Sequence, residues 1–266
     1  MLQQTQAERV IPIFERFVAQ FPNFEVLAAA ARSDVVRAWK GLGYNARAVR
    51  LHELARAVRS DAGVPSDEPA LRDLPGVGPY TARAIRAFAF NADVVAVDTN
   101  VRRIIHRTQF GVEHPSRASD RELDALATAL LPSGRAFEFN SALMDLGATL
   151  CSARAPKCPI CPLRAGCIAA PIDANALRLL AETGLRDSRN AASRVPFERT
   201  GRYLRGRIVD RLRALPGNRR LSLLDLSAHL AATAPDHGSE AIASALAALA
   251  SEGLIERSRD KVRLRT

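Results

Sequence analysis

The chain has 266 residues, of which 47% are hydrophobic and 25% charged, and its formal net charge is +10 at pH 7. This length predicts one large domain or a medium-sized domain with a small appendage. The positive charge favours a polyanionic partner, with nucleic acid ahead of a membrane surface. Because no run of eighteen apolar residues occurs and no signal peptide opens the chain, we expect no membrane contact and a cytoplasmic location, at the nucleoid if the source is bacterial.

Apolar residues recur at helical spacing through most of the first 200 positions. The first pattern runs from Val10 to Phe21, and the second lies at residues 35–39 after a cap at Ser33 or Asp34. A Gly-Leu-Gly-Tyr turn follows at residues 41–44. Later helices are predicted at residues 46–60, 68–73, 80–90, 101–108, 119–131 and 137–150. Few strand signals precede residue 200, so we predict a main domain that is all-α.

Residues 74–78 (Leu-Pro-Gly-Val-Gly) lie between two predicted helices, where one proline and two glycines allow a tight hairpin. Backbone amides in such a hairpin, with a helix N-terminus directly after them, suit a phosphate. An ordinary helical hairpin would give the same pattern. A helix at residues 80–90 and an extended return over residues 94–97 can bring Asp98 back near Tyr80 and the hairpin. A carboxylate beside a phosphate-binding hairpin indicates a site that acts on the nucleic acid itself.

Asp98 also has a simpler interpretation, because the run Asp98-Thr99-Asn100 stands directly before a predicted helix and Asp98 can cap it. The two roles are compatible. A helix N-terminus favours the negative charge of a carboxylate, and that charge is what would stabilise a cationic sugar.

All four cysteines fall between residues 151 and 167, with the spacing C-x6-C-x2-C-x5-C. A chain of this length can bury a core without disulfides, so the spacing indicates a ligand cage. Structural zinc sites usually offer two close cysteine pairs, and this segment has one. Four cysteine thiolates are the usual ligands of a 4Fe-4S cluster. The pattern therefore favours such a cluster over zinc or over four unrelated buried thiols.

The C-terminal part has a different pattern. Residues 186–213 contain nine arginines and three acidic residues, typical of a linker or clamp that lies along phosphates. Helices are predicted up to about residue 215, at 223–230 and at 239–252, and two hairpin strands at 254–257 and 261–264. Three helices and a basic hairpin suggest a winged helix, a fold that often binds a DNA groove. A packing or protein-contact module is the alternative.

Residues 74–82, 97–101 and 144–148, together with the cysteine spacing, resemble the helix-hairpin-helix DNA glycosylases of the endonuclease III superfamily. Residues 1–6 and 41–44 are similar to the adenine DNA glycosylases, which act on adenine opposite 8-oxoguanine or guanine. The resemblance implies a mainly α, two-lobed glycosylase fold with a 4Fe-4S cluster loop. We expect an N-terminally truncated glycosylase domain at 1–170 (helical barrel 1–110, cluster lobe 111–170). A basic linker at 171–200 and a small winged-helix (α+β) module at 201–266 complete the expected domains.

By this resemblance the catalytic residues are Asp98, Tyr80 and Asn100. Tyr80 stands where bifunctional enzymes carry a lysine that forms a Schiff base, so the resemblance implies a monofunctional N-glycosylase that leaves the strand uncut. Its partner would be double-stranded DNA with a mismatched or oxidised base pair, bound by a monomer. The implied DNA contacts are Gln3, Gln4, Tyr44, Leu74, Gly76, Val77, Gly78 and Thr81. The implied cluster ligands are Cys151, Cys158, Cys161 and Cys167.

Two of these residues carry specific roles by the resemblance. Gln4 would act as the wedge in the opened duplex, and Tyr44 would intercalate beside the opposite purine. The catalytic glutamate of the adenine enzymes lies two residues before the methionine that matches Met1, and we expect a misplaced start codon or a truncated sequence as the reason for its absence. Two alternatives stay open: a thymine or uracil mismatch glycosylase of the same fold, against which residues 3–5 argue, and a DNA-binding protein without catalysis.

Overall fold

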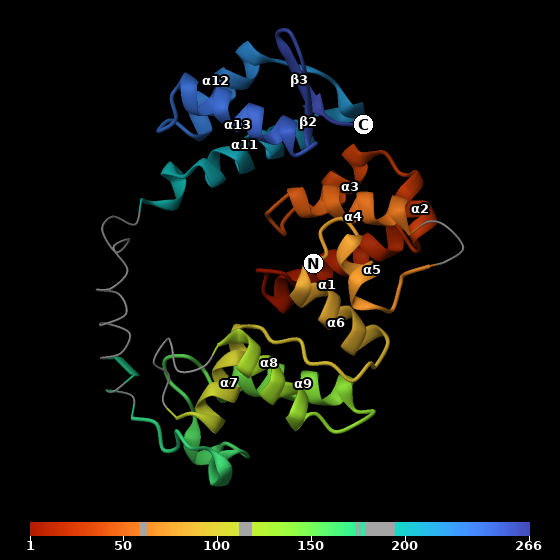
Figure 1. Cartoon of the computed structure of the whole chain (residues 1–266). Coiled ribbons are helices and arrows are strands. Elements are labelled where there is room, and N and C mark those ends of the chain that lie inside the picture. The colour runs from red at the N-terminus through yellow and green to blue at the C-terminus, as the bar shows by residue number, and fades with distance from the viewer. Residues whose placement is uncertain (59–62, 112–118, 174, 176, 179–194) are drawn as a thin grey trace. The chain divides into compact units, whose positions relative to one another are not determined.

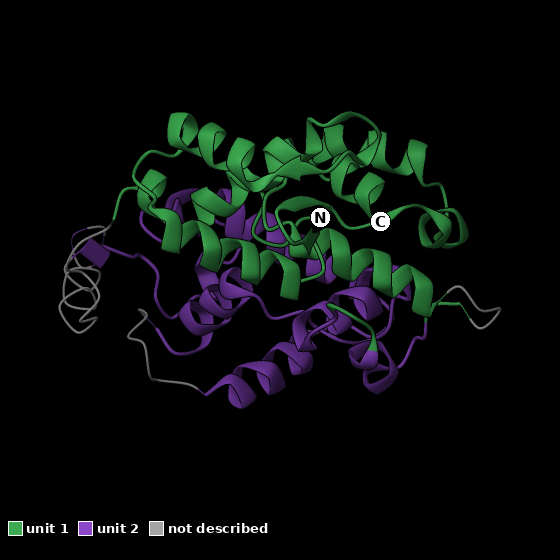
Figure 2. Ribbon diagram, turned by 90° about the horizontal axis from the view of Figure 1, so that it is seen from above, with its two compact units in different colours: residues 1–64, 74–76, 194–266 green, residues 65–73, 77–193 purple. Residues whose placement is uncertain are grey.

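The structure, a computed structural model, describes the chain except for residues 59–62, 112–118, 174, 176 and 179–194 (Figure 1). It is mainly helical, as predicted. The chain forms two compact units, the first from Met1–Val64, Leu74–Gly76 and Arg194–Thr266 and the second from Pro65–Asp73 and Val77–Ser193 (Figure 2). No helix in the described part of the chain is long and apolar enough to cross a membrane.

Four helices begin the first unit: α1 (Ala7–Gln20), α2 (Phe24–Ala29), α3 (Arg32–Ala38) and α4 (Ala46–Ala57). The short helix α2 was not predicted, although Asn23 caps it by accepting a hydrogen bond from the Val26 amide at 2.8 Å. The predicted cap of α3 at Ser33 or Asp34 is wrong, because the N-cap is Ala31 and α3 starts at Arg32, with Ser33 buried within its first turn. Helix α4 ends at Ala57, and the last two residues of its predicted range lie outside the described part.

The C-terminal part of the first unit contains the three helices and the hairpin that the sequence predicts. The helices are α11 (Gly201–Arg213), α12 (Leu223–Thr233) and α13 (Ser239–Ser251), and the strands are β1 (Leu221–Ser222), β2 (Ile255–Ser258) and β3 (Lys261–Leu264). The strands pair antiparallel in the order β1-β3-β2. The two-residue strand β1 is too short to carry a sequence signal, and its pairing of Leu221 with Val262 adds it to the hairpin.

One hydrophobic core joins the N-terminal helices to this C-terminal part. Trp39 of α3's C-cap and Leu204 and Ile208 of α11 belong to the same buried cluster. Arg213 ties the two segments further, because it donates hydrogen bonds to the Val36 carbonyl at 3.0 Å and to Asn45 Oδ1 at 2.8 Å. The expectation that the arginines up to residue 213 lie along phosphates is therefore wrong for Arg213, whose side chain is 6% exposed.

The second unit contains α5 (Glu68–Asp73), α6 (Pro79–Ala89), α7 (Thr99–Gln109), α8 (Asp120–Leu130) and α9 (Ala136–Thr149). The predicted helices agree with these to within two residues. Helix α8 starts with a reciprocal capping box between Ser119 and Glu122. The extended return before α7 is held by the buried Asn140, which accepts a hydrogen bond from the Ala96 amide at 2.8 Å and donates to the Val94 carbonyl at 3.0 Å.

Candidate functional site

Asp98 caps helix α7, as the sequence predicts, and its carboxylate accepts three hydrogen bonds. Oδ1 accepts from the backbone amides of Asn100 at 2.8 Å and Val101 at 2.7 Å, and Oδ2 accepts from Asn100 Nδ2 at 3.1 Å. The side chain is half-buried. Charge-assisted bonds at a helix N-terminus stabilise a negative charge and fix its direction. The site therefore holds one oriented carboxylate with solvent access.

Asn100 is itself held by a neighbour that sequence analysis missed. Arg103, which is 8% exposed, donates from Nη2 to Asn100 Oδ1 at 2.8 Å and to the Gly147 carbonyl at 3.0 Å. Its Nε donates to the Cys151 carbonyl at 2.8 Å. A continuous hydrogen-bonded chain thus runs from the backbone of Cys151 through Arg103 and Asn100 to Asp98. The only sequence signal was an arginine one helical turn after Asn100.

Gly147 makes this close approach possible. A Cβ atom at residue 147 would lie 2.7 Å from Asn100 Cβ and 3.3 Å from Ile104 Cδ1. The first distance is too short for any side chain, so only glycine lets α9 pack this tightly against α7 at Asn100. The packing of the two helices therefore sets the position of Asn100, and through it that of Asp98.

Tyr80 lies in the first turn of α6, in the same unit as Asp98, and is 39% exposed. Partial burial raises the pKa of its phenol, and the negative charge of Asp98 raises that pKa further. A phenol is neutral at neutral pH even with its ordinary pKa, and both effects move the pKa of Tyr80 further from neutrality, so its hydroxyl can donate a hydrogen bond. It has no amine, so it cannot form a Schiff base with a sugar aldehyde.

The hairpin between α5 and α6 uses its two glycines differently. Gly76 has φ +80°, and a Cβ there would lie 2.9 Å from Arg50 Cβ. Gly78, at the N-cap of α6, has φ −93°, is exposed, and has no atom within 4 Å of a built Cβ. Val77 between them is 8% exposed. Gly76 therefore serves the backbone turn, whereas Gly78 leaves open space in front of a helix N-terminus.

The two remaining hairpin predictions have less distinctive surroundings. Leu74, which follows α5, and Thr81, in the first turn of α6, are both half-buried.

Arg47 binds the N-terminal segment to the turn at residues 41–44. Its guanidinium donates to the Met1 carbonyl at 3.0 Å, to the Gln3 carbonyl, to Thr5 Oγ1 at 3.0 Å and to the Leu42 carbonyl at 2.9 Å. Sequence analysis did not select Arg47, since one arginine in a helix of a basic chain carries no signal. The predicted DNA-contacting residues of both segments share this one side chain as their support.

Gln4 and Tyr44 both stand on left-handed backbone, with φ 55° and 42°. Gln3, Gln4 and Tyr44 are all exposed, Tyr44 by 42%. Non-glycine residues adopt this conformation uncommonly, and such residues gather at functional sites. The hydrogen bonds of Arg47 and of Trp39 Nε1 to the Gly43 carbonyl, at 3.4 and 3.1 Å, hold the turn that presents Tyr44.

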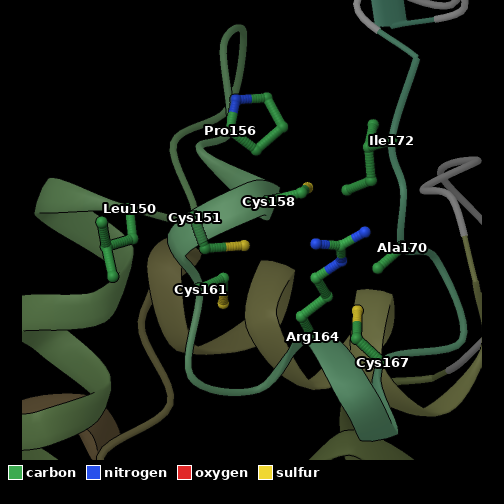
Figure 3. Close-up of a pocket in the computed structure, with 9 residues that line it drawn as sticks. All are labelled: Leu150, Cys151, Pro156, Cys158, Cys161, Arg164, Cys167, Ala170 and Ile172. Carbon is green, nitrogen blue, oxygen red and sulfur yellow. The ribbon is translucent and has the colours of Figure 1, made fainter.

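The four cysteines line one pocket in the second unit (Figure 3). They are all free thiols and half-buried. The lining is completed by Leu150, Pro156, Arg164, Ala170 and Ile172. Cys151 follows α9, whereas Cys158, Cys161 and Cys167 lie in or beside the short 3-10 helices Cys158–Ile160 and Arg164–Gly166. The spacing in the sequence thus returns all four thiols to one place.

Arg107 lies beside this pocket and contacts the segment that begins at Cys151. It is fully buried, and it donates to Cys151 Sγ at 3.4 Å and to the carbonyls of Ser152 at 2.8 Å and Ala153 at 3.0 Å. Cys167 Sγ lies 3.5 Å from the Arg107 carbonyl. A buried guanidinium needs negative or polar partners, and a cysteine thiolate beside it would meet that need. Sequence analysis did not select Arg107 either.

Among the described residues, the four cysteines line the pocket with no histidine or carboxylate beside them, a donor set that fits a thiolate-held cluster. Arg164 points its guanidinium among the cysteines (Figure 3). Across the described residues, no group of three or more histidine, cysteine or acidic side chains is arranged to hold a metal ion. The four-cysteine lining is what supports a cluster at this place.

The structure therefore groups the predicted residues in two sets. The second unit brings Tyr80, Asp98 and Asn100 together, and the cysteine pocket is connected to them through Arg103. The first unit brings Gln3 and Gln4 together with Tyr44. Within the hairpin, between Gly76 and Val77, the chain passes from the first unit to the second.

The helical second unit thus has a hairpin before α6 and a capped carboxylate before α7. Residues 1–129 match the HhH-GPD superfamily base excision DNA repair proteins. The chain belongs to this superfamily.

Its curated relatives include adenine DNA glycosylases. The enzyme of Mycolicibacterium smegmatis is 49% identical over 165 residues, which cover 61% of this chain and 56% of that protein. The enzyme of Mycobacterium tuberculosis is 43% identical over 223 residues, covering 80% of this chain and 68% of that protein. The chain thus spans about half to two thirds of the length of these relatives. The resemblance drawn from residues 1–6 and 41–44 is confirmed.

A relative of a second type is the thymine/uracil-DNA glycosylase of Methanothermobacter thermautotrophicus, 36% identical over 170 residues that cover 63% of this chain and 77% of that protein. Among solved structures, a thermostable thymine-DNA glycosylase aligns with a TM-score of 0.55 at 35% identity, over 62% of this chain and 78% of that one. A trapped endonuclease III–DNA covalent intermediate aligns with a TM-score of 0.56 over 67% and 81%. At 24% identity the latter shows the fold alone, and the predicted endonuclease III-like fold is confirmed.

Proposed function

We propose that the protein is a monofunctional DNA N-glycosylase that removes adenine mispaired with 8-oxoguanine or guanine. The observation that carries this proposal is the oriented, half-buried carboxylate of Asp98, in a chain 49% identical to an adenine DNA glycosylase over 165 residues. Cleavage of an N-glycosidic bond builds positive charge on the sugar. A fixed negative charge beside the sugar stabilises that transition state more than the ground state.

In this proposal the target base is flipped out of the duplex, at a cost of about a few kcal/mol of lost stacking and pairing. The bond between the sugar and adenine then breaks, and the base leaves with the electron pair and takes up a proton. Asp98 stabilises the oxocarbenium-like sugar or adds to it covalently, as carboxylates do in glycoside hydrolysis, and water completes the reaction by adding to the sugar carbon. Asn100 and Arg103 hold that carboxylate in place. Because Tyr80 lacks an amine, the abasic strand stays intact.

Double-stranded DNA is the proposed partner, bound by a monomer. The N-terminus of α6 and the open space at Gly78 offer a place for a backbone phosphate. Gln4 and Tyr44 are proposed to probe the opened base pair, since both are exposed on fixed left-handed backbone. The net charge of +10 supports a polyanionic ligand.

Cys151, Cys158, Cys161 and Cys167 are proposed to hold a 4Fe-4S cluster. Its contribution would be structural: it would fix the loop that follows α9 and, through the Cys151 carbonyl, the position of Arg103. The buried Arg107 beside Cys151 Sγ would balance part of the negative charge of the thiolates.

Protein purified without oxygen is therefore expected to be brown, with broad absorption near ~400 nm and about four iron atoms per chain. Replacement of Cys158 by serine should lower the iron content and destabilise the fold. Metal analysis and absorption spectra measure both. Colourless protein with one zinc and no iron would show that the four thiols bind a different metal.

The proposed substrate is tested with duplexes that carry adenine opposite 8-oxoguanine, guanine or thymine, and with thymine or uracil opposite guanine. We expect abasic sites in the first two duplexes, formed slowly because the glutamate that the resemblance implies as general acid is not among residues 1–266. Strand breaks are expected only after treatment with alkali or heat. A matched thymine–adenine duplex serves as the control. Excision of thymine or uracil in place of adenine would favour the second candidate, which the thymine/uracil-DNA glycosylase relative supports. Tight duplex binding without excision of any base would favour a DNA-binding protein.

We also propose that the C-terminal elements form a winged helix at 201–266, following a glycosylase domain at 1–170 and a basic linker at 171–200. Three helices and a three-stranded antiparallel sheet in the order β1-β3-β2 support the winged helix. A cytoplasmic location goes with this DNA-directed function.

A further inference from the structure

Two arginine side chains lie over the ring of Tyr44, and one of them comes from the far end of the sequence. The guanidinium carbon of Arg47 lies 5.7 Å from the centre of the Tyr44 ring, and that of Arg202 lies 4.8 Å from it. Arg47 belongs to α4 and Arg202 to the first turn of α11. Both Tyr44 and Arg202 are exposed. The C-terminal part therefore places a positive charge on the surface that carries Gln3 and Tyr44.

Arg202 differs in its partners from four of the five other arginines of residues 199–213; among the described residues, only Arg211 shares its lack of a carboxylate partner. Four arginines of residues 199–213 face carboxylates: Arg199 faces Asp236, Arg205 faces Glu252, and Arg207 and Arg213 face Asp210. Within the described residues, Arg202 has no carboxylate in ion-pair range and stacks on Tyr44. A guanidinium stacked on an aromatic ring keeps its N–H edges available for a phosphate.

The stack is not required to hold α11 in place. Leu204 and Ile208 are buried in the core that α11 shares with α3, and Arg213 bonds Asn45, the residue after Tyr44, at 2.8 Å. These buried contacts fix α11 next to the turn at residues 41–44. Arg202 is thus an exposed cation on a helix that other contacts hold in place, and such a side chain is suited to binding a ligand.

We propose that the C-terminal module, residues 196–266, forms part of the DNA-contacting surface, and that Arg202 binds a backbone phosphate of duplex DNA beside Tyr44. The inference rests on the proposed function in taking DNA as the ligand. It adds a contact from outside residues 1–129, the range that matches the superfamily. A phosphate contact carries no base information, so Arg202 raises affinity for matched and mismatched duplexes alike.

The test compares Arg202→Met with the wild-type chain, by fluorescence anisotropy on a labelled duplex between about 50 and 200 mM salt. Methionine keeps an unbranched apolar stem and removes the charge. Loss of one phosphate contact is expected to make the log–log salt slope shallower by about 0.9, and to weaken binding roughly five- to tenfold at about 0.1 M salt. Arg199→Met is the matched control, since it removes the same formal charge three residues earlier, where Asp236 already balances it.

Arg199→Met is expected to change the slope by less than about 0.3, well below one phosphate contact. In a Tyr44→Ala background, Arg202→Met is expected to cost less than in the wild type, because the guanidinium has lost the ring that positions it. If Arg202→Met lowers the melting temperature, the salt dependence of duplex binding is measured again with Arg202→Gln. An unchanged slope for Arg202→Met, or an equal drop for Arg199→Met, overturns the proposal.

Excision of adenine by the wild-type chain is measured in the same samples. Salt-dependent binding that requires Arg202, without excision, contradicts the proposed function and leaves the Arg202 contact standing. Excision of adenine together with an unchanged salt slope for Arg202→Met supports the proposed function and overturns the Arg202 contact.

Discussion

Replacement of Asp98 by asparagine is expected to slow adenine excision by about 10²–10³-fold or more, the usual effect of removing one preorganised electrostatic group. Asparagine has nearly the same shape, and its Oδ1 can still accept from the amides of Asn100 and Val101, which bond Asp98 at 2.8 and 2.7 Å. The negative charge that the sugar cation needs is gone. Single-turnover excision from an adenine–8-oxoguanine duplex measures the loss, and anisotropy on the same duplex is expected to show binding within a fewfold of the wild type.

Asn100→Ala provides the matched control. It removes the 3.1 Å bond from Asn100 Nδ2 to Asp98 but leaves the charge and both backbone donors, so its loss of excision should be smaller. A thermal melt checks that both variants are folded. Equal excision by wild-type and Asp98→Asn chains would show that the charge of Asp98 takes no part in bond cleavage, and another carboxylate would have to be sought.

The sequence predicted those parts of the fold that depend on local periodicity and on turn residues. Helices α4 to α9, the hairpin at residues 74–78 and the cap at Asp98 all follow from signals within one or two turns of chain. It failed for α2 and for the start of α3. At α3 the N-cap is Ala31, whose side chain makes no capping hydrogen bond, and Ser33, a residue type expected at a cap, is buried inside the first turn.

The sequence predicted the candidate functional residues themselves, but it did not predict the arginines that hold or neighbour them. Asp98 and the four cysteines are conspicuous because their residue types and spacing are chemically specific. Arg103, Arg47 and Arg202 are three arginines among many in a basic chain. Each acquires its role from a partner more than 40 residues away or in another helix, such as the Cys151 carbonyl for Arg103. Sequence reasoning about one residue type cannot select among them without the tertiary fold.

The two hairpin glycines allow a second test with large expected effects, because the structure separates their roles. Gly76→Val is expected to destabilise the fold by about 1–3 kcal/mol, the cost of a non-glycine residue in strained backbone. A valine there must adopt φ near +80° and would press its Cβ to 2.9 Å from Arg50 Cβ. Thermal denaturation measures this loss.

Gly78→Val is expected to leave the stability of the fold nearly unchanged and to weaken duplex binding. Its φ of −93° suits any residue and nothing lies within 4 Å of the added Cβ, so the melting temperature should change little. The branched side chain would instead occupy the space through which a phosphate reaches the N-terminus of α6, and we expect duplex binding to weaken by an order of magnitude or more, because the ion would lose its contact with the first-turn amides. Anisotropy at fixed salt measures the change.

Gly238→Val is the control for this test. Gly238 is likewise an exposed N-cap glycine with open space around a built Cβ, in front of α13. A helix N-terminus that binds no phosphate should tolerate the added side chain, so this variant is expected to keep its affinity. If Gly238→Val weakens binding and Gly78→Val does not, the phosphate is held by the C-terminal module and the hairpin is only a turn. If both variants bind as the wild type does, neither helix N-terminus contacts the DNA, and the salt-dependent affinity must come from side chains such as Arg202.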